Sequence, residues 1–200
     1  MEELIIPNPS QHDTISYEIS LGGSKMDSSY EILSISIDKE VNRIPTAKIL
    51  LKDGDASLGK FEISNKQDFV PGKEIVIKLG FDSDNKQAFN GIITKHQVKV
   101  KENGNTQLLI ECKDAAVRMT LGRKSKYFLD QKDSEVMDSI ISSYADLTGD
   151  VEATSLKHKE LIQHHLSDWD FIALRAEANG QLLFANDGLF FKRVLGTKNL

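Results

Sequence analysis

The segment from His164 to Val194 constrains the fold more than any other part of the chain, because it carries both ends of a helix and a hairpin after it. Ser167 and Asp170 have the three-residue spacing of a capping box at a helix start. Asn179-Gly180 supplies the left-handed residue that ends many helices. The sequence therefore predicts a capped helix over about ten residues.

The second half of this segment predicts a β-hairpin. Gln181–Ala185 and Leu189–Val194 are apolar runs, and the turn sequence Asn186-Asp187-Gly188 joins them. A hairpin by itself is marginally stable in water and needs further strands or a packing partner. We therefore expect either that the chain is a fragment of a longer protein, which is the preferred interpretation, or that another chain completes the hairpin.

The first 118 residues are rich in β-strand patterns. Apolar and polar residues alternate in short runs that end at Gly, Pro or polar turns, and no long helix pattern lies between them. Six strands at this spacing favour a small antiparallel β-barrel or sandwich, and a closed barrel would leave no unpaired edge strand. Gly91 inside one strand allows a bend or a close backbone approach. The predicted strands are Ile15–Leu21, Glu31–Ile37, Ala47–Leu51, Glu74–Phe81, Phe89–Val100 and Thr106–Cys112.

The pattern changes after Asp114. Apolar residues from Val136 to Tyr144 recur at helical spacing, with Asp133 or Ser134 as a candidate cap and Gly149 beyond the end. The predicted fold is thus mainly β with an α+β part. Its predicted divisions are a first barrel domain at 1–118, a helical insertion at 119–178, and the start of a second barrel at 179–200.

Composition excludes several classes of function. The net charge of −5 argues against general nucleic-acid binding, which requires a basic stripe. Cys112 is the one cysteine, so no internal disulfide can form. Met1–Ser10 lacks the basic start and long apolar run of a signal peptide, and no run is long enough for a membrane helix. We expect a protein made in the cytoplasm.

The polar residues do not form a recognisable reaction centre. His158, His164 and His165 with Asp168 and Asp170 match no standard zinc spacing, so no metal site is predicted. Asp168 and Asp170 are better explained as carboxylates facing the N-terminal dipole of a helix. The sequence contains no Gly-rich phosphate loop after a strand and no nucleophile elbow. We therefore predict no catalytic residues, no cofactor and no enzyme activity.

Three segments together resemble the hub-and-spike proteins of contractile injection machines, which include the type VI secretion tip protein VgrG and phage baseplate hubs. The first runs from Phe69 to Phe81 and continues with the Phe89–Thr94 strand, around a Pro71-Gly72 turn. The second leads from Leu109–Asp114 to Tyr127-Phe128, and the third is the capped helix with its hairpin. The resemblance covers roughly residues 60–195.

This resemblance implies a structural role. Family members form trimers whose two related barrels per subunit adapt a threefold spike to a hexameric inner tube of the Hcp type. The implied partners are further copies of the chain, the tube protein, baseplate proteins, and effectors or a spike-tip protein. The resemblance also implies cytoplasmic assembly followed by delivery outside the cell by the machine.

Aromatic residues are the candidates for assembly contacts, because large aromatics dominate interface energetics. Such residues at the start of an amphipathic helix belong either to a core or to an interface. The predicted interface residues are Trp169, Phe171, Phe190, Phe191, Tyr127 and Phe128. An alternative hypothesis is a free-standing β-barrel module that binds a glycan or peptide through its loops.

Overall fold

The structure is a computed structural model that describes residues 14–55, 59, 61–101, 105–186 and 189–193. The helices are α1 (Asp133–Ile141), α2 (Asp168–Ala178) and two 3-10 helices, η2 (Gln67–Phe69) and η3 (Ala115–Thr120). The strands are β1 (Ile15–Leu21), β2 (Ser24–Lys25), β3 (Ile32–Asp38), β4 (Thr46–Asp55), β5 (Glu74–Phe81), β6 (Asp84–Val100), β7 (Asn105–Lys113), β8 (Lys124–Lys132), β9 (Gly149–Val151), β10 (Lys157–Leu166), β11 (Gln181–Ala185) and β12 (Leu189–Arg193).

The N-terminal part is one antiparallel sheet with the strand order β2-β1-β5-β6-β7-β4-β3. Its alternating strands bury one face each, so their apolar residues meet in a single core. All six strands expected there are present, and the mainly β fold is confirmed. The buried core residues are Ile19, Leu21, Tyr30, Ala47, Ile49, Leu51, Phe69, Ile75, Ile77, Phe89, Ile93, Leu108, Ile110 and Cys112.

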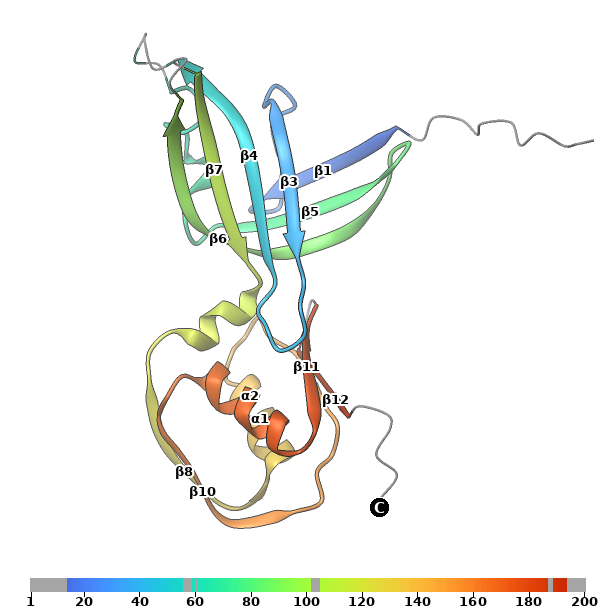
Figure 1. The fold of residues 1–200 in the computed structure, drawn as a ribbon, viewed down its shortest axis with the longest axis vertical. Helices are drawn as coiled ribbons and strands as arrows, with labels where there is room; N and C mark the ends of the chain where they lie inside the picture. The colour runs from blue at the N-terminus through green and yellow to red at the C-terminus, as the bar shows by residue number, and fades with distance from the viewer. Residues whose placement is uncertain (1–13, 56–58, 60, 102–104, 187–188, 194–200) are drawn as a thin grey trace, which may run out of the picture.

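The sheet curls around this core without closing into a barrel. The order starts at β2 and ends at β3, so β1 and β3 are not hydrogen-bonded neighbours in the described part of the chain. Gly91 allows the curl, because a Cβ at this position would lie 2.2 Å from the backbone oxygen of Lys113 on β7. The free ends of β1, β5 and β6 extend together away from the other strands (Figure 1).

The C-terminal part packs α1, α2 and η3 between a β8–β10 ribbon and a small sheet of order β11-β12-β9. Phe128 of β8 stacks on Phe171 of α2, with ring centroids 5.9 Å apart. The ribbon wraps around the outside of the two helices (Figure 1). Two cores therefore exist, and Ala116 of η3 already belongs to the second one. The division at 1–118, 119–178 and 179–200 stays a prediction.

Several expectations about the C-terminal part are confirmed. Helix α2 starts at Asp168, and its cap residue Ser167 accepts a hydrogen bond from the Asp170 backbone nitrogen at 3.1 Å. It ends before Asn179 and Gly180, and Gly180 has a φ of 63°. Strands β11 and β12 pair as predicted, whereas Asp187 and Gly188 of the turn lie outside the described residues.

Other expectations were wrong. The region predicted to be helical also holds two long strands, β8 and β10, and their ribbon buries one face only. Helix α1 is capped by neither Asp133 nor Ser134: it starts at Asp133, and Glu135 Oε2 accepts a hydrogen bond from the Lys132 backbone nitrogen at 2.8 Å. Helix α1 ends at Ile141, so Tyr144 lies beyond the helix, and Gly149 does not directly follow its end.

The hairpin is not left with two strands. Strand β9, which follows α1, pairs with β12 in parallel orientation, with Phe190 opposite Asp150 and Phe191 opposite Val151. The expectation that another chain or a missing segment completes the hairpin overlooked this strand, because Gly149–Val151 is too short to show a periodic pattern.

The two parts meet where the β3–β4 loop docks on β11. Asn42 pairs with Leu183 like a strand residue: its backbone N–H donates to the Leu183 oxygen at 2.8 Å, and its Oδ1 accepts from the Leu183 nitrogen at 2.9 Å. Asn42 has a φ of 60°, which asparagine tolerates better than most residues. Ile44 of the same loop packs against the second core.

We predict that Asn42→Ala lowers the free energy of unfolding by about 2–3 kcal/mol, because it leaves the Leu183 N–H unpaired and because alanine tolerates the left-handed region less well than asparagine. Asn42→Gly keeps the backbone relaxed, so its loss should be about 1 kcal/mol smaller. Urea unfolding measures both values. As the control, Lys39→Ala removes an exposed bond to Asn186 and should change stability by less than about 0.5 kcal/mol. Equal effects of Asn42→Ala and Lys39→Ala would contradict this role.

Candidate assembly surfaces

Three of the predicted interface residues lie inside the C-terminal part. Trp169 and Phe171 are 7% and 3% exposed and belong to its core, and Phe128 is partly buried against the same core. Their rings therefore hold β8 and α2 together within one chain. Phe190 and Phe191 pair through their backbone in β12, and their side chains lie outside the described residues.

Tyr127 is the predicted interface residue that faces solvent, with 68% of its surface exposed. It lies directly opposite Ile162 of β10, and Leu129 continues the same face of β8. Leu129 and Ile162 are 62% and 47% exposed. We call Tyr127, Leu129 and Ile162 the ribbon face. Sequence reasoning missed its last two members, because their shared face follows only from the pairing of β8 with β10.

A second exposed apolar surface lies on the projecting ends of β1 and β5. Ile15 is opposite Phe81, and Tyr17 is opposite Leu79, so these four side chains share one face. The same face is buried further along, at Ile19 of β1. Ile15, Tyr17 and Phe81 are 77%, 46% and 56% exposed. We call Ile15, Tyr17, Leu79 and Phe81 the arm face.

A groove of about 290 Å³ lies between the arm face and strand β3. Its lining is mainly apolar, with Ile32, Leu33 and Ile35 on the β3 side. The backbone edges of β1 and β3 on either side of it are not paired with each other. Exposed apolar grooves of this kind occur at interaction surfaces more often than elsewhere on a protein.

A buried ionic cluster joins the ribbon to both helices. Asp133 of α1 is 1% exposed, and its carboxylate accepts hydrogen bonds from Arg175 Nε at 2.5 Å and Asn179 Nδ2 at 3.0 Å. It also lies 2.9 Å from His158 Nε2 of β10. Burial by itself raises the pKa of Asp133, but the hydrogen bonds from Arg175, Asn179 and His158 outweigh it and bring the pKa down to about 2.

A second cluster holds the other end of the ribbon. Asp168 of α2 is buried, and its Oδ2 lies 2.5 Å from Lys124 Nζ of β8 and 2.6 Å from the Tyr144 hydroxyl. Gln163 Nε2 of β10 donates to its Oδ1 at 2.9 Å. Burial raises the pKa of Asp168, whereas these donors lower it further than burial raises it. Both clusters therefore serve to fasten strands to helices.

The histidines and carboxylates considered as metal or acid–base groups are thus dispersed. His158 and Asp168 belong to separate clusters, and Asp170 accepts a hydrogen bond from the Ser167 hydroxyl at 2.7 Å. His164 and His165 are exposed on β10. Among the described residues, no three His, Cys, Asp or Glu side chains are placed to hold a metal ion.

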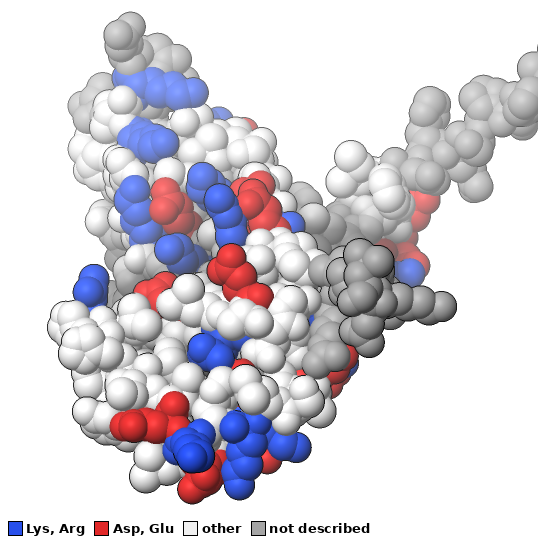
Figure 2. Space-filling model, turned by 60° about the horizontal axis from the view of Figure 1, so that its bottom comes forward, with Lys and Arg blue, Asp and Glu red and all other residues white. Residues whose placement is uncertain are grey.

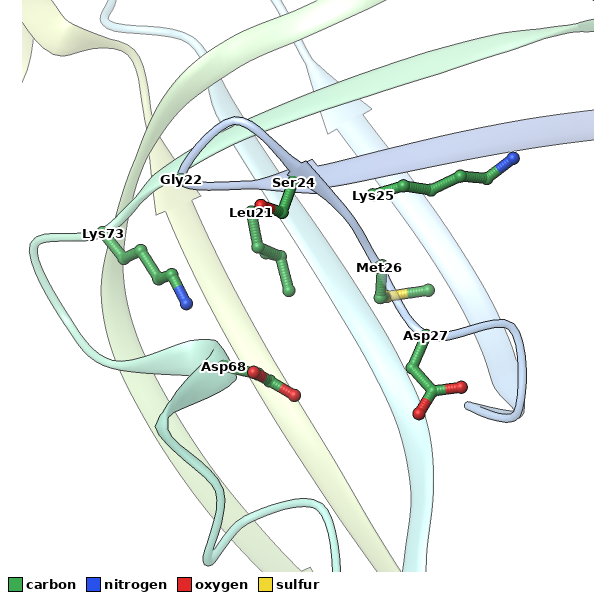
Figure 3. Close-up of a pocket in the computed structure, with 8 residues that line it drawn as sticks. All are labelled: Leu21, Gly22, Ser24, Lys25, Met26, Asp27, Asp68 and Lys73. Atoms are coloured by element: carbon green, nitrogen blue, oxygen red, sulfur yellow. The ribbon is translucent and has the colours of Figure 1, made fainter.

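A cleft of about 410 Å³ lies between the β1–β2 turn and η2 (Figure 3). Lys25, Asp27, Asp68 and Lys73 line it, so its charges are mixed. Asp68 accepts a hydrogen bond from the Tyr30 hydroxyl, and Lys73 Nζ donates to the Gln67 oxygen at 3.1 Å. These groups are thus engaged within the protein, and their arrangement defines no particular ligand.

The charged surface is mixed as well. Lys, Arg, Asp and Glu side chains alternate over the lower face of the C-terminal part (Figure 2). Several basic residues have acidic partners, such as Lys95 with Glu111 and Arg118 with Asp146. None of the helices in the described ranges has the length and apolar character needed to span a bilayer.

The fold is that of tail and type VI secretion hub proteins, as comparison with solved structures shows. The 43 kDa tail protein of prophage MuSo2 from Shewanella oneidensis aligns with 93% of this chain and 56% of its own, at 13% identity and a TM-score of 0.70. The E. coli c3393 protein, a type VI secretion component similar to the phage T4 tail proteins gp27 and gp5, aligns with 88% of this chain and 49% of its own, at 12% identity and a TM-score of 0.66.

A chain of the Francisella PdpA–VgrG complex aligns with 90% of this chain and 31% of its own, at 11% identity and a TM-score of 0.58. This chain therefore spans about half the length of the first two proteins. Among curated proteins, none matches the sequence significantly. The family model of the Alg8 N-terminal domain matches residues 11–192, and the chain belongs to that family. The resemblance to VgrG and baseplate hubs is confirmed at the level of the fold.

We predict that the Asp133 cluster makes the free energy of unfolding depend on pH in the acidic range. The pKa of Asp133 is lower in the folded protein than its ordinary value of 3.8, so its contribution is complete above about pH 4 and is lost as the pH falls through about 2. Asp133→Asn should cost about 3 kcal/mol at pH 7, because it leaves the Arg175 charge without its buried partner.

Unfolding measured from pH 7 to pH 2 tests this. The stability gap between wild type and Asp133→Asn should narrow by about 2 kcal/mol below pH 4. The control is Asp150→Asn, which removes an exposed ion pair with Lys192 and should cost less than about 1 kcal/mol at any pH. A gap that stays constant with pH would show that Asp133 is not held in its charged form by this cluster.

Proposed function

We propose that this protein is a structural component of a contractile tail or injection machine, in the position of its hub. The observation that carries the proposal is the extent of the fold likeness, which covers 88–93% of the chain in a phage tail protein, a type VI secretion component and a VgrG complex. The described surface agrees with this role, because several of its exposed apolar residues, including Ile15, Phe81, Tyr127 and Leu129, form faces on strands.

In the finer form of the proposal, three copies form a ring that adapts a threefold spike to a hexameric inner tube. The support is the resemblance of three sequence segments together with the shared fold. The partners would then be further copies of the chain, an Hcp-like tube protein, baseplate proteins, and an effector or spike-tip protein. One of the neighbours is a PdpA–VgrG complex, in which a hub-like protein is bound to another protein.

The proposed role is non-enzymatic. Its support is that the buried titratable groups of the C-terminal part, Asp133 and Asp168, are engaged by cations and amides that fasten the ribbon to the helices. Assembly in the cytoplasm and delivery outside the cell by the machine belong to the same proposal.

A tube-binding assay tests the proposal. The purified chain is mixed with an Hcp-like tube protein, and the products are measured by light scattering and negative-stain imaging. We expect ring-shaped particles of three copies that cap tube ends. A monomer that ignores the tube but binds a glycan or peptide saturably would instead support a binding module.

A further inference from the structure

Strands β4, β7 and β6 carry a group of lysines on the outward side of the curled sheet. Their inward residues, such as Ile49 and Ile110, are buried in the core, so the neighbours of these residues in sequence point outward. Basic side chains gather over the N-terminal sheet at the upper left of Figure 2. We call this outward surface the lysine panel, and the exposed lysines at its four corners are Lys48 and Lys52 of β4 with Lys95 and Lys99 of β6.

The centre of the lysine panel is apolar. Leu50 of β4 lies opposite Leu109 of β7, and both side chains are half-buried on the outward side. Strand pairing places two of the lysines opposite Glu111 on one side of the leucines, and the other two opposite Gln107 on the other side. An apolar centre with charged residues around it is typical of protein–protein interfaces.

The lysine panel is basic, although the chain as a whole has a net charge of −5. Two of its lysines have acidic partners: Lys95 lies 3.5 Å from Glu111, and Lys52 lies 3.0 Å from Glu31. The other two have no acidic partner within the part of the chain that the structure describes. The panel therefore keeps a local excess of positive charge.

This excess is confined to the panel. Two more acidic residues, Asp38 of β3 and Glu74 of β5, are exposed in the next row across the sheet. They lie opposite Thr46 and Ile92, and Lys113 of β7 lies between those two residues. That row carries both signs of charge, so a partner that reads positive charge is directed to the four lysines of the panel.

A partner reaches only the side chains of the panel. Strand β7 is hydrogen-bonded to both β4 and β6, and those two strands pair on their other sides with β3 and β5. No backbone edge of the panel is thus free for an added strand. The two lysine pairs are four residues apart along the strands, which corresponds to roughly 13 Å. An α-helix with its side chains is about 10–12 Å wide and fits between them.

We propose that the lysine panel binds an acidic amphipathic helix of a partner protein. The apolar stripe of the helix covers Leu50 and Leu109, and carboxylates on both of its flanks meet the two lysine pairs. A sheet face and an amphipathic helix bury their apolar surfaces against each other in this way inside many domains. This partner is additional to those of the proposed hub role, and its binding requires no tube protein.

The composition of the panel favours a protein over a nucleic acid. Proteins that hold single strands combine basic grooves with aromatic side chains for stacking, and arginine is the preferred residue for bidentate contacts with phosphate. The outward residues of β4, β7 and β6 described above include neither an aromatic residue nor an arginine. Glu111 in the middle strand would also repel a phosphate backbone.

A designed peptide tests the inference on the full chain. The probe is a fluorescein-labelled helix of about 18 residues with leucines at helical spacing on one side and glutamates on both flanks. Fluorescence anisotropy measures its binding, and we expect saturable binding that weakens as salt is added. A peptide of the same composition in scrambled order has no apolar stripe and should bind at least roughly tenfold more weakly.

Charge reversal locates the site. Lys48→Glu with Lys99→Glu should weaken peptide binding at least roughly tenfold, because two attractions become repulsions. The matched control is Lys157→Glu with Lys159→Glu, which reverses two exposed lysines of β10 and changes the net charge equally. The control should alter binding by less than about twofold. Circular dichroism and urea unfolding verify the fold of every variant.

The apolar centre has its own variant. Leu50→Thr with Leu109→Thr keeps residues that favour strands, removes apolar surface and should weaken binding at least roughly fivefold. Equal effects of the two lysine pairs, equal binding of the scrambled peptide, or a wild-type chain that ignores the designed peptide would each overturn the inference. A chain that binds a labelled DNA oligonucleotide in preference to the peptide would overturn it in favour of a nucleic-acid surface.

Discussion

The contact between Asn42 and Leu183 sets the geometry on which the rest of the molecule depends. The β3–β4 loop leaves the curled sheet and pairs with β11 through two hydrogen bonds, and Ile44 adds an apolar contact beside them. This junction, with the chain crossing through η3, places the projecting strands of one part relative to the ribbon of the other.

In the C-terminal part, buried polar groups hold the ribbon in place, and apolar groups form its exposed face. The buried carboxylates Asp133 and Asp168 gather cations and amides from strands and helices, so that no buried charge is left without a partner in either cluster. The ribbon is thereby held rigidly although only one of its faces is buried. Its other face, with Tyr127 and Leu129, stays available for contact. An exposed apolar face on an element that is fastened in this way agrees with the proposed role in an assembly.

The sequence predicted the N-terminal strands and the capped helix α2 well, because each carries its signal locally. A strand with one buried face alternates with period two, and Ser167 with Asn179-Gly180 marks both ends of the helix. The ribbon strands carried a weaker signal. Strand β10 contains a bulge between Gln163 and Leu166, where His165 has a φ of 51°, and this bulge interrupts the alternation. The interface residues were more difficult to predict, because an aromatic residue alone does not indicate whether a core or a partner covers it.

What the sequence determined by itself is therefore the set of local elements, the mainly β class and the resemblance to hub proteins, all of which depend on residues near one another in the chain. Only the tertiary structure decided that the sheet curls without closing, that β9 completes the hairpin, and that Trp169 and Phe171 lie inside while Tyr127 lies outside. These outcomes depend on contacts between residues far apart in sequence, such as Asn42 with Leu183. A local pattern cannot encode them, because it specifies which face of an element is apolar and not what that face will meet.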